Sequence, residues 1–391
     1  MIALDLSRLL SRARSATPSG IDRVELAYAQ RLSAGGAAHC FAARDALGRI
    51  GLLPAEASGE FVTRLAAIWR DGATAPERRR IASLARRLRL AALTGGPALR
   101  RALRETGERA VYLLVSHQGL DRPLPIARLK AATGARFVGL VHDLIPLDFP
   151  HLTRPGQTQR HRRRIATVAR LADAVIVNSA ATRDTLSARL GCCRIPIAVA
   201  PLGIDPLGDD IPPPTDPPYF VCIGTIEARK NHGLLLDVWE HLRAQLGAQT
   251  PHLALIGQRG FGSEPIVSRL AALHDVVTEH PDLPDRVTAR LLRGARALLL
   301  PSFAEGFGLP VAEALAFSVP VLCSDLPALR ESGGGGPDYL DPGDHDAWRC
   351  AILDYATDTQ RRQTQLARLA DWRPPGWIDH FATVDRLIAT L

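Results

Sequence analysis

Glu305 and Glu313 bracket the short segment GFGLPVA, which follows the apolar run 297–300. A carboxylate accepts hydrogen bonds from neighbouring hydroxyl groups, so two carboxylates close together suit a ligand rich in hydroxyls, such as a sugar. The alternative is that Glu313 complements a helix dipole and that Glu305 is a solvated loop residue. We favour the sugar ligand because of the residues between the two glutamates.

Those residues are typical of a loop that leads from a strand into a helix. Gly306 and Gly308 let a ligand approach the backbone closely, and Pro310 suits the first turn of a helix. The first backbone amides of a helix have no intrahelical acceptor and can bind an anion or hydroxyl groups. The predicted donors are the amides of Phe307, Gly308 and Leu309.

A second cluster, GTIEARKNHG, follows the strand-like run YFVCIG and precedes a predicted helix that begins near His232. Arg229 and Lys230 lie at this helix start, where the helix dipole disfavours cations unless an anionic ligand is present. Two fixed cations beside backbone donors suit a diphosphate. An ordinary basic helix entrance is the alternative. Lysine is otherwise scarce, since the chain has only Lys130 and Lys230.

The first half of the chain has candidate residues at corresponding places. Ser19 and Gly20 are predicted to form a tight turn after the strand IALDL. This turn can bring Gly20 close to a phosphate, or it can simply connect the strand to the following helix. The strand RFVGLVHD ends in His142 and Asp143. His142 can face a sugar hydroxyl or a phosphate, and Asp143 can orient it or bind an acceptor hydroxyl.

Short apolar strands alternate with amphipathic helices along the whole chain, which predicts α/β domains with parallel sheets covered on both faces. The strands run IALDL, VYLLVS, RFVGLVHD, AVIVNS and IAVAPLG, then YFVCIG, HLALIG, ALLLPS and VPVLCS. Consecutive prolines predict a linker at 206–218. We therefore expect a first domain over 1–205, a second over 219–374, and a terminal helix within 375–391 that packs on the first domain. In such sheets ligands bind at the carboxyl ends of strands.

Length and composition limit the class of protein. At 391 residues and 46% hydrophobic content, the chain can form two domains. It lacks a stretch of eighteen apolar residues and an apolar leader, so we expect a cytoplasmic protein. Six cysteines (Cys40, Cys192, Cys193, Cys222, Cys323 and Cys350) lack metal-ligand spacing, and we interpret them as reduced core residues without a zinc site.

The formal net charge is +8, and arginines in 75–105 and 159–164 carry much of the excess. These segments can be solvated helix faces. They can also attract anionic lipid head groups, because Ile81, Leu84, Leu88 and Leu90 recur near helical spacing beside the arginines. The chain has no recognition module or aromatic stacking motif for nucleic acid.

With these residues in hand, the chain resembles the retaining nucleotide-sugar glycosyltransferases of glycosyltransferase family 4. The likeness rests on SGIDRV, VHDLIP, AVIVNSAATRDTL, IAVAPLGID, GTIEARKN, LALIGQRGFG and, most specifically, EGFGLPVAE, which is similar to the family's E-x7-E signature. It implies the GT-B fold, with two Rossmann-like domains that face each other across a cleft. The second domain would hold a GDP- or UDP-sugar, and the first a saccharide or lipid-linked acceptor.

The resemblance also implies roles for individual residues. Glu305 would contact the donor sugar near the reacting carbon, and Glu313 would bind the ribose hydroxyls. Lys230, helped by Arg229, would stabilise the departing diphosphate, so no metal or other cofactor is expected. His142 corresponds to a histidine at the cleft. The remaining donor-binding residues would be Gly20, Gly224, Thr225, Gly306, Phe307, Gly308 and Leu309.

Two positions depart from the family pattern. Thr225 follows Gly224 where many relatives have an arginine, and Ser318 stands where a glycine is usual.

Two other functions stay open at this point: a hydrolase or epimerase of nucleotide-sugars, and a non-catalytic nucleotide-sugar-binding assembly protein. The family resemblance favours a transferase for surface polysaccharide or lipopolysaccharide synthesis, at the inner face of the membrane.

Overall fold

The computed structural model describes residues 1–35, 37–45, 47–191, 194–204, 218–357 and 359–391, and the chain forms two compact units. Unit 1 comprises Met1–Leu147, Gly156–Ala200 and His380–Leu391. Unit 2 comprises Asp148–Pro155 and Pro201–Asp379. The predicted linker lies outside the described residues except for Pro218, so the predicted domain bounds stay predictions.

Unit 1 is built on a seven-stranded sheet with the order β3-β2-β1-β4-β5-β6-β7. The strands are β1 (Ile2–Asp5), β2 (His39–Arg44), β3 (Ile50–Leu52), β4 (Val111–Leu114), β5 (Arg136–Val141), β6 (Ala174–Val177) and β7 (Ile197–Val199). All neighbours pair in parallel except β2 and β3. The five predicted strands are confirmed. The antiparallel β2–β3 pair was missed, because β2 begins and ends with polar residues and β3 has only three residues.

Helices connect and cover the strands of unit 1, as the apolar sequence of the strands requires. They are α1 (Ser7–Arg12), α2 (Gly20–Ser33), α3 (Ala55–Asp71), α4 (Ala75–Thr94), α5 (Gly96–Thr106), α6 (Leu124–Thr133), α7 (Ile145–Asp148), α8 (Gln157–Leu171), α9 (Ala180–Leu190) and the C-terminal α17 (Trp377–Ala389). Helix α7 ends, and α17 begins, in unit 2. Within unit 1, the Tyr28 hydroxyl on α2 lies 2.8 Å from His380 Nε2 on α17.

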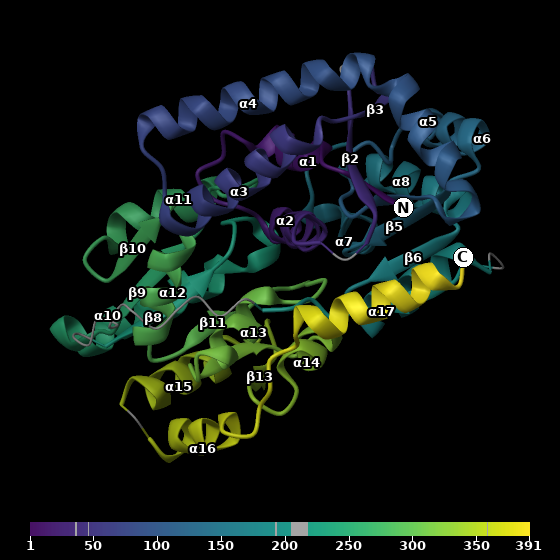
Figure 1. Ribbon diagram of the computed structural model, residues 1–391. Coiled ribbons are helices and arrows are strands. Elements are labelled where there is room, and N and C mark those ends of the chain that lie inside the picture. The colour runs from purple at the N-terminus through teal and green to yellow at the C-terminus, as the bar shows by residue number, and fades with distance from the viewer. Residues whose placement is uncertain (36, 46, 192–193, 205–217, 358) are drawn as a thin grey trace. The chain divides into compact units, whose positions relative to one another are not determined.

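The long helix α4, drawn in blue in Figure 1, corrects one expectation about the basic segment 75–105. Ile81, Leu84 and Leu88 are buried in unit 1, whereas Leu90 is 57% exposed. The apolar residues at helical spacing therefore belong mainly to the protein core and are not available to insert into a membrane. The arginines of α4 lie on its solvent-exposed side.

Unit 2 is built on a six-stranded parallel sheet with the order β10-β9-β8-β11-β12-β13. The strands are β8 (Tyr219–Ile223), β9 (His252–Ile256), β10 (Val277–His280), β11 (Leu298–Leu300), β12 (Val321–Ser324) and β13 (Asp338–Leu340). The helices are α10 (His232–Leu246), α11 (Glu264–Leu270), α12 (Asp285–Gly294), α13 (Leu309–Ala316), α14 (Pro327–Gly333), α15 (His345–Ala356) and α16 (Gln360–Leu369). The four predicted strands are confirmed.

Alternate residues of β8 enter two different core clusters of unit 2. Phe220 and Cys222 pack in one cluster, and Tyr219 and Val221 in the other. Both faces of the sheet are therefore buried, as its continuous apolar strands predicted. Cys222 and Cys323 are core residues as expected, but Cys350 is exposed on α15, and Cys192 and Cys193 lie outside the described residues.

Each sheet has a topological switch point, where the chain leaves one side of its first strand and returns on the other. In unit 1 this point lies between β1 and β4, and in unit 2 between β8 and β11. Ligands of open α/β sheets bind beyond the carboxyl ends of the strands at such a point. The segments that follow β8 and β11 contain the predicted donor-site residues.

Candidate functional site

Lys230, Arg229 and Glu305 form a compact ionic cluster at the switch point of unit 2. Lys230 Nζ donates a hydrogen bond to Glu305 Oε1 over 2.6 Å, and Arg229 Nη1 lies 3.1 Å from Glu305 Oε2. The cations come from a 3₁₀ turn (Ala228–Lys230) after β8, and Glu305 from the loop after β11. The backbone joins the two segments as well, since the Phe303 amide donates to the Arg229 carbonyl.

The ionic cluster is largely removed from water. The side chains of Lys230 and Glu305 are only 7% and 8% exposed. Burial alone would raise the pKa of Glu305, but the positive charges of Lys230 and Arg229 outweigh it and lower the pKa to about 2. Glu305 is therefore ionised at neutral pH and is a poor proton donor.

Arg229 also fixes the loop that carries Glu305. Its guanidinium donates to the Ala304 carbonyl over 2.8 Å and to the Glu227 carboxylate. Asn231, which follows the two cations, has φ 54°, a left-handed conformation that asparagine tolerates better than most residues. Lys230 and Asn231 of EARKNH thus have separate roles: Lys230 forms an ion pair, and Asn231 adopts the left-handed conformation of a backbone turn.

Two glycines in this region are required by their surroundings. Gly224 has φ 144°, and a Cβ atom there would lie 3.0 Å from Lys230 Cε and 3.2 Å from Nζ. Gly308 has φ 86°, and a Cβ atom there would lie 2.2 Å from Leu329 Cδ2. Gly224 therefore leaves space for the lysine side chain, and Gly308 for the close packing of α13 on α14.

The start of α13 offers backbone hydrogen-bond donors. Among the described residues, the amides of Phe307, Gly308 and Leu309 have no acceptor. Glu313 lies one turn into the helix and is half-buried. The structure thus brings Gly224, Arg229, Lys230 and Glu305 together, and places Glu313 on the adjoining helix.

The two departures from the family pattern also have structural settings. Thr225 follows β8, and its Cγ2 would lie 2.6 Å from a Cβ atom at Gly260, so the side chain fills the space that this glycine leaves. Ser318 adopts φ 56°, a conformation that costs little for glycine and more for other residues. This explains why a glycine is usual at the position of Ser318.

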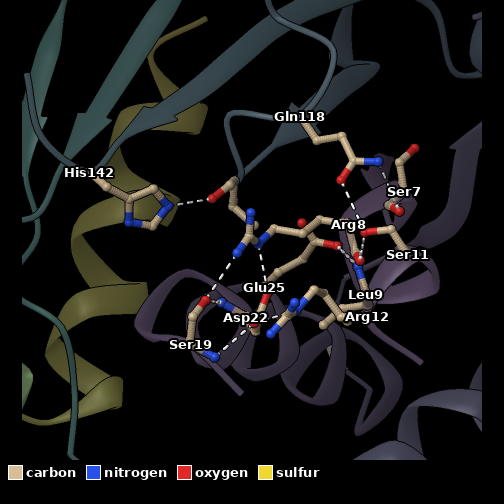
Figure 2. Close-up of polar contacts among 11 residues, drawn as sticks. Ser7, Arg8, Leu9, Ser11, Arg12, Ser19, Asp22, Glu25, Gln118 and His142 are labelled. Atoms are coloured by element: carbon tan, nitrogen blue, oxygen red, sulfur yellow. Dashed lines mark hydrogen bonds and ion pairs between the residues drawn. The ribbon is translucent and has the colours of Figure 1, made fainter. Parts of the chain in front are cut away.

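In unit 1, Gly20 is the exposed first residue of α2. Ser19 caps this helix, and Asp22 completes the capping box. Figure 2 shows Arg8 and Arg12 of α1 directed at the start of α2, where Arg8 Nε lies 2.6 Å and Arg12 Nε 3.1 Å from the buried Asp22 carboxylate. These arginines were missed by sequence analysis, because the short helix α1 that positions them has no clear periodic signal.

His142 follows β5 and is buried. Its Nε2 lies 2.8 Å from the Val115 carbonyl, which requires a proton on Nε2 and leaves Nδ1 as a hydrogen-bond acceptor (Figure 2). Burial lowers the pKa of His142 to about 4, so the ring is neutral at pH 7. A neutral acceptor nitrogen favours a hydroxyl partner over a phosphate. Asp143 accepts a hydrogen bond from the Ile145 amide at the start of α7.

Other buried polar residues near the switch point of unit 1 were not predicted. His117 follows β4, and its ring lies 5.3 Å from that of His142. Glu25 of α2 is fully buried and accepts the Leu9 amide, and burial raises its pKa to about 8. Arg164 of α8 is also buried. The signal for Arg164 was present in QRHRRR, since residues three and four apart share a helix face, but we interpreted that segment as exposed.

No group of three or more His, Cys, Asp or Glu residues within the described ranges is arranged to hold a metal ion. Among the helices in the described part of the chain, none has the length and apolar character needed to cross a bilayer.

The fold defines the class of protein. The structure of Anabaena Alr3699/HepE in complex with UDP-glucose superposes with a TM-score of 0.64 and 15% identity, covering 100% of this chain and 99% of that one. The two parallel-sheet α/β units have the GT-B fold of glycosyltransferases.

Family models match in succession along most of the chain. The model "Glycosyltransferase Family 4" matches residues 20–206, and "Glycosyl transferases group 1" matches residues 217–358. The chain belongs to glycosyltransferase family 4.

Curated relatives match over shorter stretches. The O-antigen chain mannosyltransferase B of Escherichia coli is 35% identical over 163 residues, which is 41% of this chain and 42% of that protein. The serotype-specific mannosyltransferase WbdA of Escherichia coli is 27% identical over 224 residues, which is 51% of this chain and 27% of that protein. The chain thus spans less than half the length of these relatives.

Proposed function

We propose that the protein is a retaining hexosyltransferase that moves a sugar from a nucleoside-diphosphate sugar to a saccharide acceptor. The buried cluster of Lys230, Arg229 and Glu305 is the observation that carries this proposal. A diphosphate placed beside the two cations and the amides of 307–309 would find the donors that a leaving group requires. UDP- and GDP-sugars are the candidate donors, since related proteins are named mannosyltransferases and a structural neighbour binds UDP-glucose.

In the proposed reaction the bond between the anomeric carbon and the donor phosphate breaks, and a bond from that carbon to an acceptor oxygen forms. The acceptor proton passes to the leaving phosphate, so the products are a glycoside and a nucleoside diphosphate. Lys230 would stabilise the negative charge that develops on the leaving oxygen. Glu305 would orient Lys230 and accept a hydrogen bond from the donor sugar.

The state of Glu305 supports front-face attack over a covalent intermediate. A carboxylate paired with two cations, with a pKa of about 2, is a weak nucleophile. The same two cations support a proposed independence from divalent metal, because they supply positive charge at the leaving group. Turnover in the presence of excess EDTA measures this, and loss of activity that Mg²⁺ or Mn²⁺ restores would contradict it.

The acceptor is proposed to be a growing surface polysaccharide or its lipid-linked precursor, in line with the names of the O-antigen relatives. The enzyme would work on the cytoplasmic side of the membrane. The exposed arginines of α4, such as Arg86 and Arg87, support electrostatic attraction to anionic lipids. Flotation with anionic and neutral liposomes tests this attraction, and equal binding to both would contradict it.

A panel of UDP- and GDP-sugars, titrated by calorimetry and then incubated with saccharide acceptors, tests the proposed function. We expect one donor to bind and to yield a product with the donor's anomeric configuration, determined by NMR. Sugar release without acceptor would identify a hydrolase, and an altered donor sugar an epimerase. Donor binding without turnover against any acceptor would identify a binding protein.

A further inference from the structure

Arg164, on α8 of unit 1, is a buried cation that lacks a partner. The residue is 9% exposed, its Nε is fully buried without a hydrogen-bond partner, and among the described residues the guanidinium has no ion-pair partner. A buried charge without a partner is costly, and folded proteins normally pair it. An anionic group of a bound ligand would supply the partner that this guanidinium lacks.

The two carboxylates that act electrostatically on Arg164 are engaged elsewhere. Asp121 lies 3.1 Å from Arg160, which precedes Arg164 by one helical turn. Asp143 accepts the Ile145 amide. Both carboxylates act on Arg164 at longer range, and burial nevertheless lowers the pKa of Arg164 to about 10, so it remains charged at neutral pH.

His117 provides a second donor, near enough to Arg164 for the two side chains to interact electrostatically. Its Nε2 accepts the His142 amide over 3.3 Å, so the neutral ring carries its proton on Nδ1. Among the described residues, Nδ1 has no acceptor. The His117 ring lies 5.1 Å from that of His161, which shares a buried face of α8 with Arg164 at a spacing of three residues.

Arg164 and His117 thus combine one positive charge with a neutral donor, next to the strand end that carries His142. We propose that they form a subsite for an anionic oxygen group, a phosphate ester or a carboxylate, carried by the acceptor. The inference rests on the proposed function, because it takes the acceptor to be bound by unit 1. It adds that the acceptor is charged close to the sugar that receives the transfer.

Three hexose probes that differ in charge test the subsite: glucose 1-phosphate, glucuronic acid and glucose. Each is titrated into the full chain with UDP and GDP at saturating concentration, so that the phosphate-binding groups of unit 2 are occupied. We expect glucose 1-phosphate or glucuronic acid to bind and glucose not to bind. The charged probe that binds distinguishes a phosphate from a carboxylate. Failure of both charged probes to bind, or equal binding of glucose, would overturn the proposal.

Arg164→Gln and Arg163→Gln form a matched pair, since both remove one positive charge from α8 and Arg163 is exposed. Loss of a charge-assisted hydrogen bond predicts a dissociation constant for the charged probe that rises about tenfold or more in Arg164→Gln, and no change in Arg163→Gln. An equal rise in both variants would mean a general electrostatic effect and would overturn the proposal. Nucleotide affinity, measured in parallel, reports separately on the proposed donor function.

The stability of the ligand-free protein provides a second readout. Because Arg164 has no partner, Arg164→Gln should leave the denaturation midpoint unchanged or raise it. A lowered midpoint would show that the guanidinium holds the fold together, and would overturn the assignment of this cation to a ligand.

Discussion

Replacement of Lys230 by methionine tests the ionic cluster of unit 2 most directly. Methionine has a similar length and volume but no charge, so Lys230→Met leaves Glu305 buried beside Arg229 alone. We expect a lower free energy of unfolding, and a strong loss of turnover because the leaving diphosphate would lack its ammonium partner.

Two routes give the magnitude of the stability change. Removal of one partner from a buried ion pair costs about 3–5 kcal/mol. Independently, burial and the charges of Lys230 and Arg229 together move the pKa of Glu305 from 4.5 to about 2, a net change that corresponds to about 3 kcal/mol at ~1.4 kcal/mol per pKa unit. Because Arg229, 3.1 Å from Glu305, would still pair with the carboxylate in the variant, we expect a loss at or just below the lower end of this range, about 2–3 kcal/mol.

The assay is a double-mutant cycle of Lys230→Met, Glu305→Gln and the double variant, followed by guanidinium denaturation at pH 7. We expect a coupling energy of about 2 kcal/mol, because Glu305→Gln removes the charge that Lys230→Met leaves unpaired. Lys130→Met is the matched control: Lys130 lies in unit 1, bound to Asp173, and its loss should leave donor affinity and turnover unchanged apart from any loss of stability.

Additive effects of the two single substitutions would refute the argument, as they would mean that Lys230 and Glu305 do not interact in solution. Near-normal turnover in Lys230→Met, with donor binding intact, would remove Lys230 from the proposed mechanism. A stability loss without a turnover loss would leave the cluster as a structural feature only.

Two further predictions concern a glycine and a buried carboxyl. Gly224→Ala should lower the free energy of unfolding by about 1–3 kcal/mol and weaken donor binding, because the new Cβ meets Lys230 and φ is 144°. Gly233→Ala is the control and should be neutral, since the nearest atom to its Cβ lies 3.8 Å away. Equal denaturation midpoints for the two variants would contradict this prediction. Glu25 has a folded-state pKa of about 8 against an ordinary 4.5, so its contribution to stability is present below pH 4.5 and falls as pH rises to 8. As pH rises from 5 to 8, the free energy of unfolding of Glu25→Gln should therefore increase by about 3 kcal/mol relative to that of the wild type. Parallel pH profiles of the free energy of unfolding for the two proteins would contradict the raised pKa.

The sequence predicted the α/β architecture and the strand ends because these features depend on local patterns. Continuous apolar runs such as β6 and β12 can be buried only in a sheet covered on both faces, whatever surrounds them. The turn at Gly308 was predictable too, since glycines followed by a proline are typical of a loop that enters a helix. The antiparallel β2–β3 pair was not, because β2 has polar residues at both ends and β3 has only three residues.

The sequence by itself thus placed Lys230, Glu305 and His142 at the carboxyl ends of parallel strands and indicated a sugar nucleotide as ligand. Only the tertiary structure decided that Lys230 and Glu305, 75 residues apart, share a hydrogen bond, and that Arg164 is buried while Arg163 faces solvent. The physical reason is that charge interactions depend on distances of a few ångströms and on exclusion of water. Both are set by segments remote in sequence, which no local pattern records.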